Sequence, residues 1–387
     1  AVHQFHGGSA IGDGITNGML FTQRLLRELG FYSEIFAINP AAELRHVIRP
    51  YDEHPGHLAG NDEILLVHFS MGHEDHSWID TVACDKILVW HNITPERFLH
   101  HESLRRAAAL GRNQIAVWGQ KIQAGIRPSP FIGAISDSNF NQRELLDAGF
   151  DDQFLQMATL PLLVDLDLHR KMAGAPKAHS LSDPFSLPVR LLFVGRLVAN
   201  KCQHELISIL AQLRARMRRR VHLTLVGDGD EGYIASLKAL AEREHVADAL
   251  HITGKISNQE LGEYYRNADL FVCLSEHEGF CMPLIEAAIH RIPILAYAAG
   301  GAVSETLGEG ALILTQKSQP EIIAAIILLL EEPALRRSVV DGQTANLARF
   351  EPEALKRALG NYIEKLGFRM PTFSSRPVKS IIRQADY

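Results

Sequence analysis

Short apolar blocks alternate with helical patterns along this chain, in two successive series. In the first half, apolar runs typical of buried parallel strands occupy residues 64–68, 86–90 and 131–135. Helices are predicted between such runs, for example at residues 19–29 and 104–110. A second series of strands is predicted at residues 189–194, 222–226, 250–253, 268–274, 292–296 and 311–314. This alternation predicts an α/β protein with two doubly wound parallel sheets.

The two series divide the chain into domains. Residues 1–170 form the first predicted domain and residues 189–350 the second. Residues 171–188 are rich in Ala, Ser, Pro, Lys and His, which is typical of a linker. An apolar run at residues 322–330 predicts a buried helix that stops at residues 331–333. A last helix is predicted at residues 351–366, followed by a tail to Tyr387.

The most informative segment, residues 275–286, places the carboxylates of Glu278 and Glu286 across a loop-to-helix junction. Pro283 suits the first position of that helix, because its missing N–H would be unpaired there anyway. Glu278 and Gly279 then lie at the carboxyl end of a strand, where open α/β sheets bind ligands. The free N–H groups at the helix start suit phosphate. Glu286, one turn further on, can accept hydrogen bonds from two adjacent sugar hydroxyls.

A second chemical element, residues 194–204, follows the first strand of the second domain. Gly195 permits a tight turn close to a ligand. Arg196 and Lys201 lie just beyond the strand, where together they can neutralise a diphosphate. The alternative for these two residues is a pair of surface cations that flank a loop.

These segments resemble the retaining GT-B glycosyltransferases of family 4. The resemblance rests on the Glu-x7-Glu string, on Arg291-Ile-Pro293, on Gly300-Gly301 with Glu305, and on the Gly-Arg-Leu-x-x-x-Lys signature that begins at Gly195. Two departures are expected, His290 and Cys202, each at a place where the family usually has Gly. The resemblance implies two Rossmann-like domains that face a cleft, with residues 1–170 on the acceptor side and residues 189–350 binding the nucleotide sugar. It also implies that the last helix, within residues 351–387, crosses back to the first domain.

The family likeness also suggests roles for the first loop and for one histidine. Gly8 and Gly12 lie in a loop whose backbone N–H groups can approach phosphate closely, and Asp13 is a carboxylate beside them, although Asp-Gly is also ordinary turn chemistry. The loop lacks the Gly-x-Gly-x-x-Gly spacing of a nicotinamide site. His91 closes a predicted strand and resembles the family histidine that contacts the transferred sugar.

From these arguments we assign provisional roles. Arg196, Lys201, Glu278 and His91 are the predicted catalytic residues. The predicted donor-binding residues are Gly8, Gly12, Asp13, Gly195, Gly279, Phe280 and Glu286. The resemblance implies same-face attack by the acceptor hydroxyl, with the leaving diphosphate stabilised by cations. No metal ligand and no cofactor are predicted; the nucleotide-diphosphate sugar is the donor substrate.

Composition limits the class of protein. With 387 residues, 46% hydrophobic and 22% charged, the chain is typical of globular α/β domains, and its net charge of −6 does not favour nucleic acid. Cys84, Cys202, Cys273 and Cys281 are scattered without a Cys-x-x-Cys pair, which argues against a structural zinc site or a disulfide framework. No signal peptide pattern begins the chain. We therefore expect a cytoplasmic protein. Peripheral contact at the inner face of a membrane is left open, and so is an origin as one domain of a larger protein.

Two classes of function remain after the sequence analysis. The first is a retaining hexosyltransferase that uses a nucleotide-diphosphate sugar and a glycan, lipid-linked or small-molecule acceptor, in the synthesis of polysaccharide or glycoconjugate. The second is a GT-B sugar-nucleotide epimerase or a non-catalytic sugar-nucleotide-binding domain. The presence of Arg196, Lys201 and Glu286 together favours the transferase, because a degenerate domain is expected to lose one of them.

Overall fold

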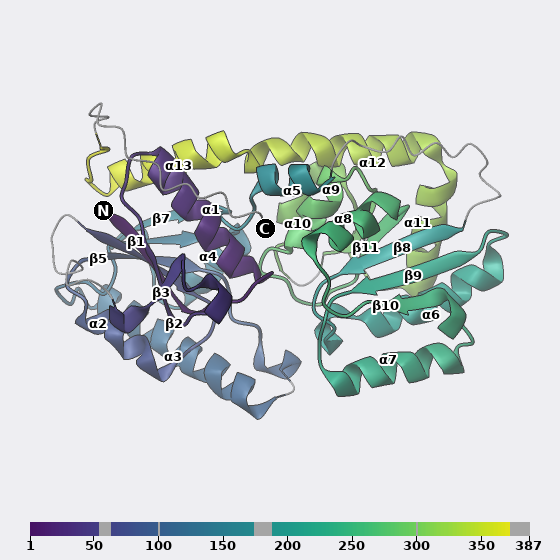
Figure 1. The fold of residues 1–387 in the computed structure, drawn as a ribbon, viewed down its shortest axis with the longest axis horizontal. Helices are drawn as coiled ribbons and strands as arrows, with labels where there is room; N and C mark the ends of the chain where they lie inside the picture. Colours follow the sequence, from purple (N-terminus) through teal and green to yellow (C-terminus); the bar gives the residue numbers. More distant parts are fainter. Residues whose placement is uncertain (54–62, 100, 174–187, 299–300, 372–387) are drawn as a thin grey trace.

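The computed structural model describes residues 1–371, apart from residues 54–62, 100, 174–187 and 299–300. Most of the predicted linker, Gly300 and the tail beyond residue 371 lie outside the described residues. Within them the chain forms two parallel sheets, each covered by helices on both faces (Figure 1). The predicted fold class, two Rossmann-like α/β domains, is confirmed.

The first sheet has the spatial order β3-β2-β1-β4-β5-β6-β7, and all of its pairings are parallel. Its strands are β1 (Val2–Gly8), β2 (Ile35–Asn39), β3 (Ile48–Pro50), β4 (Ile64–Phe69), β5 (Asp85–Trp90), β6 (Gly133–Ser136) and β7 (Gln156–Thr159). Its helices are α1 (Gly14–Glu28), α2 (Trp78–Thr81), α3 (Glu102–Gln123) and α4 (Asn139–Asp147). Helix α3 extends well beyond the predicted residues 104–110.

The second sheet has the order β10-β9-β8-β11-β12-β13 and is also fully parallel. Its strands are β8 (Val189–Val194), β9 (Val221–Val226), β10 (Leu250–Ile252), β11 (Leu270–Cys273), β12 (Ile294–Tyr297) and β13 (Leu312–Leu314). The remaining helices are α5 (Leu166–Ala173), α6 (Gln203–Arg216), α7 (Glu231–Arg243), α8 (Asn258–Asn267), α9 (Met282–Ile289), α10 (Val303–Leu307), α11 (Gln319–Glu331), α12 (Pro333–Asn346) and α13 (Pro352–Lys365).

The chain crosses between the sheets earlier than residue 170. Leu163, Val164 and Leu166 already pack in the core of the second domain, together with α8 and α9. Helix α5 therefore lies on the second domain, although residues up to 170 were expected in the first. The physical reason is that these apolar side chains are buried against α8 and α9 rather than against the first sheet.

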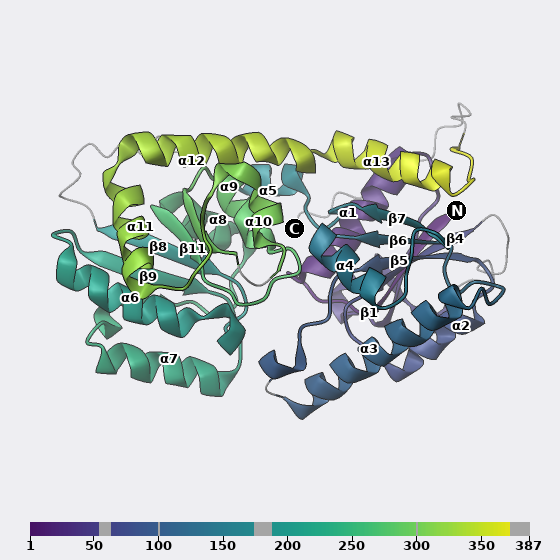
Figure 2. The same cartoon turned by 180° about the vertical axis from the view of Figure 1, so that it is seen from behind.

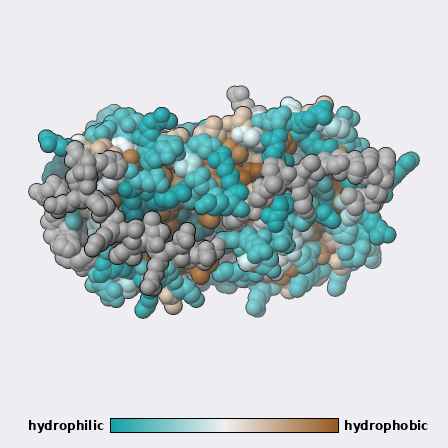
Figure 3. All heavy atoms as spheres, turned by 45° about the horizontal axis from the view of Figure 1, so that its top comes forward, coloured by the Kyte–Doolittle hydropathy of each residue, from teal (hydrophilic) through white to brown (hydrophobic). Residues whose placement is uncertain are grey.

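Helix α13 returns to the first domain. Leu355, Leu359 and Ile363 are buried with Val2 and Phe21 of the first sheet and α1. The Tyr362 hydroxyl donates to the Gln156 carbonyl oxygen at 2.9 Å, which ties α13 to the edge strand β7. In Figures 1 and 2, α12 and α13 run almost in line along one side of the molecule and span both domains. The face that carries them is mostly hydrophilic, with only small apolar groups (Figure 3).

Several helix ends follow local sequence signals. Helix α11 ends at Glu331, as predicted, but Pro333 immediately opens α12, where its fixed φ suits a first helical position. Pro283 is the second residue of α9 rather than the first, because Met282 is already helical. None of the helices in the described ranges combines the length and apolar character that a membrane span needs.

Candidate active site

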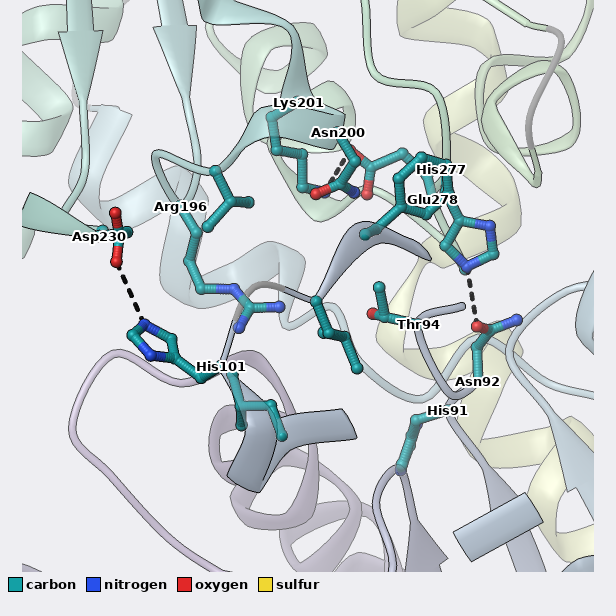
Figure 4. A pocket seen from close by; sticks show the side chains of 16 residues that line it. His91, Asn92, Thr94, His101, Arg196, Asn200, Lys201, Asp230, His277 and Glu278 are labelled. Carbon is teal, nitrogen blue, oxygen red and sulfur yellow. Dashed lines mark hydrogen bonds and ion pairs between the residues drawn. The ribbon is translucent and has the colours of Figure 1, made fainter. Parts of the chain in front are cut away.

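A cavity of about 400 Å³ lies between the two domains (Figure 4). Loops that follow the carboxyl ends of β5, β8, β9 and β11 form its walls, as expected for ligand sites of parallel sheets. It is lined by His91, Asn92, Thr94, Phe98, Leu99, His101, Leu104, Arg196, Val198, Asn200, Lys201, Gly229, Asp230, His277, Glu278 and Gly279. The four predicted catalytic residues are thus brought to one cavity.

The loop after β8 carries both predicted phosphate-binding cations. Gly195 has a φ of 149°, and a Cβ at Gly227 would lie 2.1 Å from its carbonyl oxygen, so both positions require glycine. The exposed Arg196 side chain extends into the cavity between His101 and Thr94, and Lys201 lies on the opposite wall (Figure 4). The two cations therefore line a common cavity.

The two residues that were expected to replace a family glycine, Cys202 and His290, differ in backbone conformation. Cys202, in a usual glycine position, has a φ of 57°, a left-handed conformation that explains why glycine is favoured there. The expectation that His290 occupies the other glycine position was wrong. His290 has a φ of −78°, whereas Arg291, two residues before Pro293, has a φ of 57°. The left-handed residue in this turn is therefore Arg291.

Lys201 and Glu278 form a buried ion pair. The Nζ atom of Lys201 lies 2.5 Å from Oε1 of Glu278, and both side chains are largely shielded from solvent. Burial by itself lowers the pKa of Lys201, but the adjacent Glu278 carboxylate outweighs it, so the pKa is raised. Lys201 therefore stays charged, which its predicted role in phosphate binding requires.

Glu286 lies one turn inside α9, away from the residues that line this cavity. The Tyr265 hydroxyl donates to its Oε2 at 2.6 Å, and His169 Nε2 lies 3.7 Å from its Oε1. Burial, followed by the nearby Glu286 carboxylate, raises the pKa of Tyr265 well above its ordinary value, so the hydroxyl remains a donor. One carboxylate oxygen of Glu286 is thus fixed in orientation, while the other faces a partly buried histidine.

His91 belongs to a buried hydrogen-bonded chain that begins at a backbone carbonyl. Gln4 Nε2 donates to the Met19 carbonyl oxygen at 3.0 Å, so Gln4 Oε1 must accept from His68 Nε2 at 2.9 Å. Burial lowers the pKa of His68 well below its ordinary value, so its Nδ1 carries no proton and accepts from His91 Nε2 at 2.8 Å. His91 Nδ1 lies 2.7 Å from Asp137 Oδ2.

This chain occupies both ring nitrogens of His91. The Met19 carbonyl lies at one end of the chain, and the Asp137 carboxyl group lies at the other, against Nδ1 of His91. The expected hydrogen bond from the His91 ring to a sugar hydroxyl would have to displace one of these partners. In this arrangement His91 forms part of the cavity wall, with its ring held rigidly.

His277 connects the motif loop to the first domain. Its Nε2 donates to Asn92 Oδ1 at 2.9 Å, and its ring lies between the rings of Phe98 and Phe140, with centroids 6.0 and 5.9 Å away. A Cβ at Gly279 would lie 3.0 Å from the Asn92 Cβ. Glycine at 279 therefore permits the close approach of the two domains.

The start of α4 receives a carboxylate from the other domain. Glu305 accepts from the backbone N–H groups of Asn139 and Phe140 at 2.7 and 3.3 Å. Ser138 caps the same helix through the Asn141 N–H and also donates to the Gly279 carbonyl oxygen at 2.9 Å. A carboxylate at a helix start is favourable because it meets unpaired N–H groups and the positive end of the dipole.

The remaining predicted donor-binding residues lie outside this cavity. Asp13 caps α1, where its Oδ2 accepts from the N–H and the hydroxyl of Thr16, both at 2.9 Å. The loop that holds Gly8 and Gly12 approaches the start of α9, since a Cβ at Gly14 would lie 2.7 Å from the Met282 methyl. Phe280 is buried in the second domain's core against Phe350, with ring centroids 5.9 Å apart.

Sequence analysis did not assign several residues that shape this site. Tyr265, which contacts Glu286, and Asn200, His277 and Asp230, which line the cavity, were not singled out. The partners of His277 and Asp230 lie far away in the chain. Asp230 Oδ2, for instance, lies 3.1 Å from His101 Nε2 in the first domain. His277 lies inside the recognised motif, but no local pattern indicates that its partner is Asn92.

Comparison with solved structures identifies the architecture as GT-B. HepE from Anabaena, solved with UDP and glucose, superimposes with a TM-score of 0.70 at 16% identity, over 94% of this chain and 99% of that one. Sucrose-phosphate synthase from Thermosynechococcus elongatus gives a TM-score of 0.68 at 17% identity, with the same coverage of both chains. At these identities the likeness concerns the fold.

Sequence comparison adds a family likeness for the second domain. Residues 185–345 match the family described as "Glycosyl transferases group 1". A D-inositol 3-phosphate glycosyltransferase from Kineococcus radiotolerans is 28% identical over 56% of this chain and 52% of its own length. A GDP-mannose-dependent alpha-mannosyltransferase from Mycolicibacterium smegmatis is 29% identical over 46% of this chain and 44% of its own. The chain spans about half the length of the curated relatives it matches. These matches show that the second domain is similar to group 1 glycosyltransferases.

Proposed function

We propose that the protein is a retaining glycosyltransferase that moves a hexose from a nucleotide-diphosphate sugar to an acceptor hydroxyl. The observation that carries the proposal is the convergence of Arg196, Lys201 and Glu278 on one interdomain cavity. The family match of the second domain and the nucleotide-sugar relatives point to the same chemistry.

The proposed mechanism is electrostatic. Departure of the nucleoside diphosphate builds negative charge, which Arg196 and Lys201 stabilise from the second domain. The start of α9 adds backbone N–H groups, since within the described residues no side chain caps it. These positive groups make a metal unnecessary for the leaving group.

The acceptor hydroxyl attacks on the face from which the diphosphate leaves, and the leaving phosphate takes its proton. Glu278 contacts the transferred sugar and Glu286 the ribose. A pair of glycosidase-like carboxylates is not proposed, because both would have to flank one bond at about 5 Å. Glu286 instead points toward Tyr265 and His169.

The acceptor is proposed to be a glycan, a lipid-linked sugar or a small molecule, consistent with a role in polysaccharide or glycoconjugate synthesis at the cytoplasmic side of the cell. The cavity lining is both polar and apolar, because it includes Phe98, Leu99 and Leu104 as well as Asn200 and Asp230.

An NMR time course with a panel of nucleotide sugars and acceptors tests the proposal. Transfer with retained anomeric configuration is the expected result. An epimerised donor without transfer would identify a sugar-nucleotide epimerase, and binding without any turnover would identify a non-catalytic domain. Transfer with inverted configuration would contradict the proposed mechanism but not the class of enzyme.

A further inference from the structure

Two cysteines and a glutamate that are separated in sequence meet inside the motif loop. Cys273 ends β11, Cys281 begins α9, and Glu278 lies in the loop between them. The chain reverses direction in this loop, so the two sulfur atoms come within 4.0 Å. All three possible ligand atoms, the two Sγ atoms and a Glu278 oxygen, lie within 4.8 Å of one another.

The distance between the sulfur atoms suits a shared metal better than a disulfide. A disulfide requires about 2.05 Å between its sulfur atoms, roughly half the observed 4.0 Å. Two thiolates on one tetrahedral zinc ion, each about 2.3 Å from the metal, lie about 3.8 Å apart. The pair therefore needs only a small adjustment to hold a soft divalent cation.

The surroundings are compatible with such a cation. Cys273 is fully buried, whereas Cys281 is partly exposed, so the pair is not sealed from solvent. Glu278 uses Oε1 for Lys201, which leaves Oε2 as a third ligand.

A second cluster of possible metal ligands lies nearby. Cys202, Glu205 and Glu276 also place their ligand atoms close together. There, Lys317 Nζ lies 3.0 Å from the Cys202 sulfur and 2.9 Å from Glu205, so an ammonium group already occupies the position of a cation. Lys201 is likewise paired with the carboxylate of the Cys273 cluster.

We propose that Cys273, Cys281 and Glu278 form a site for a soft divalent cation such as zinc, and that its occupation blocks the active site. On binding, both thiols release their protons to solvent, two metal–sulfur bonds form, and the carboxylate and a water complete four ligands. The inhibitory part rests on the proposed function, because a metal bound to Oε2 keeps Glu278 from contacting the donor sugar.

Binding is measured first, without any assay of activity. The full chain is titrated with Co²⁺ and Cd²⁺ under a phosphine reductant, with the visible bands of tetrahedral cobalt thiolate and the ultraviolet cadmium–thiolate band as readouts. We expect one equivalent to produce these bands. Cys281→Ser and Cys273→Ser should each weaken binding by roughly tenfold or more, since even outer-shell changes cost about 10- to 100-fold.

Cys202→Ser is the matched control. Cys202 and Cys281 both precede a helix in the left-handed conformation, with φ values of 57° and 71°. We expect Cys202→Ser to bind the metals like the wild type. Circular dichroism and thermal unfolding of each variant confirm folding, and retained bands in both Cys273→Ser and Cys281→Ser would overturn the site.

Inhibition is measured next. Zn²⁺ should suppress turnover of the wild type and of Cys202→Ser, EDTA should restore it, and Cys281→Ser should resist. Metal binding at the expected site without inhibition would refute the regulatory part alone. Failure to detect transfer with any donor would count against the proposed function and would leave the spectroscopic result intact.

Discussion

Lys201 and Glu278 bind one another inside the cavity, with 2.5 Å between Nζ and Oε1. We propose that they serve different parts of the donor, Lys201 the diphosphate and Glu278 the sugar. A donor that engages both must therefore compete with their ion pair. The pair also keeps two buried charges compensated, and an uncompensated buried charge is costly.

Arg196→Ala and Lys201→Ala should each lower turnover by at least tenfold. The reason is the loss of a charge-assisted hydrogen bond to a developing anion, worth about 1.5–3 kcal/mol. Steady-state kinetics with the best donor measures the effect, and circular dichroism checks folding. Arg218→Ala, at an exposed arginine just past α6, is the control and should behave like the wild type. Near-normal turnover in both variants would remove this loop from the catalytic machinery.

The two glutamates of the motif should respond differently to the free nucleotide. Glu286→Gln should weaken binding of a nucleoside diphosphate, by up to about 1.5–3 kcal/mol for bonds to a charged group. Glu278→Gln should leave that binding nearly unchanged and depress turnover, because the free nucleotide lacks the sugar. Isothermal titration calorimetry compares them. Equal losses of nucleotide affinity would contradict the division of roles.

Tyr265→Phe provides a finer test of Glu286. The variant removes only the hydroxyl that donates to Oε2 at 2.6 Å. We expect nucleotide affinity to fall, by less than in Glu286→Gln, because the carboxylate loses its fixed orientation. An affinity equal to that of the wild type would show that the contact does not serve the nucleotide site.

Transfer should survive chelation. With Arg196, Lys201 and the start of α9 available to neutralise the leaving group, EDTA is expected not to lower turnover. Activity is measured before and after dialysis against EDTA, with and without added magnesium. Loss of activity that magnesium or manganese restores would contradict the metal-independent mechanism.

Loss of the contact between His91 and Asp137 should lower the free energy of unfolding. Both side chains are almost completely buried, and Asp137 would be left as an unpaired charge in His91→Phe. Breaking a buried pair costs about 3–5 kcal/mol, so urea unfolding should show a large loss in that variant. The double variant His91→Phe with Asp137→Asn should regain a substantial part of the lost free energy of unfolding. A single variant as stable as the wild type would show that this contact does not stabilise the fold.

Acidification should destabilise the protein before its carboxylates titrate. Burial lowers the pKa of His76, His277 and His290 from 6.5 to about 4. Because the unfolded chain binds these protons and the folded protein does not, stability is full above pH 6.5 and falls between pH 6.5 and 4. The slope is up to about 1.4 kcal/mol per pH unit for each histidine.

Urea unfolding at several pH values between 7 and 5 measures that slope. His76→Gln should make it shallower, because one histidine no longer takes up a proton on unfolding. A free energy of unfolding that is constant over this range would contradict the neutral, buried state of these histidines.

The sequence predicts the central strands better than the edges. Strands β4, β5, β8 and β9 are buried in the middle of their sheets and appear as apolar runs. Strand β3 is a short edge strand that includes Pro50, and β7 begins at the exposed Gln156, so neither has such a run. The left-handed Cys202 was foreseeable because glycine is usual at that position.

Long-range pairs could not be foreseen. Asn92 and His277 are 185 positions apart, and only the folded chain brings them together. Cys273 and Cys281 are near in sequence but lack the spacing of known metal motifs. Their proximity depends on the turn between β11 and α9, which sequence patterns do not specify in detail. The roles of local charges were therefore easier to predict than their partners.

The chain passes between the two domains twice, once before α5 and once before α13. A body held at a single point can pivot in any direction, whereas one held at two points turns mainly about the line that joins them. The two crossings therefore restrict relative motion of the domains mainly to rotation about the line that joins them. Rotation of one domain about that line would break the contacts of Glu305, His277 and Asp230 between the domains.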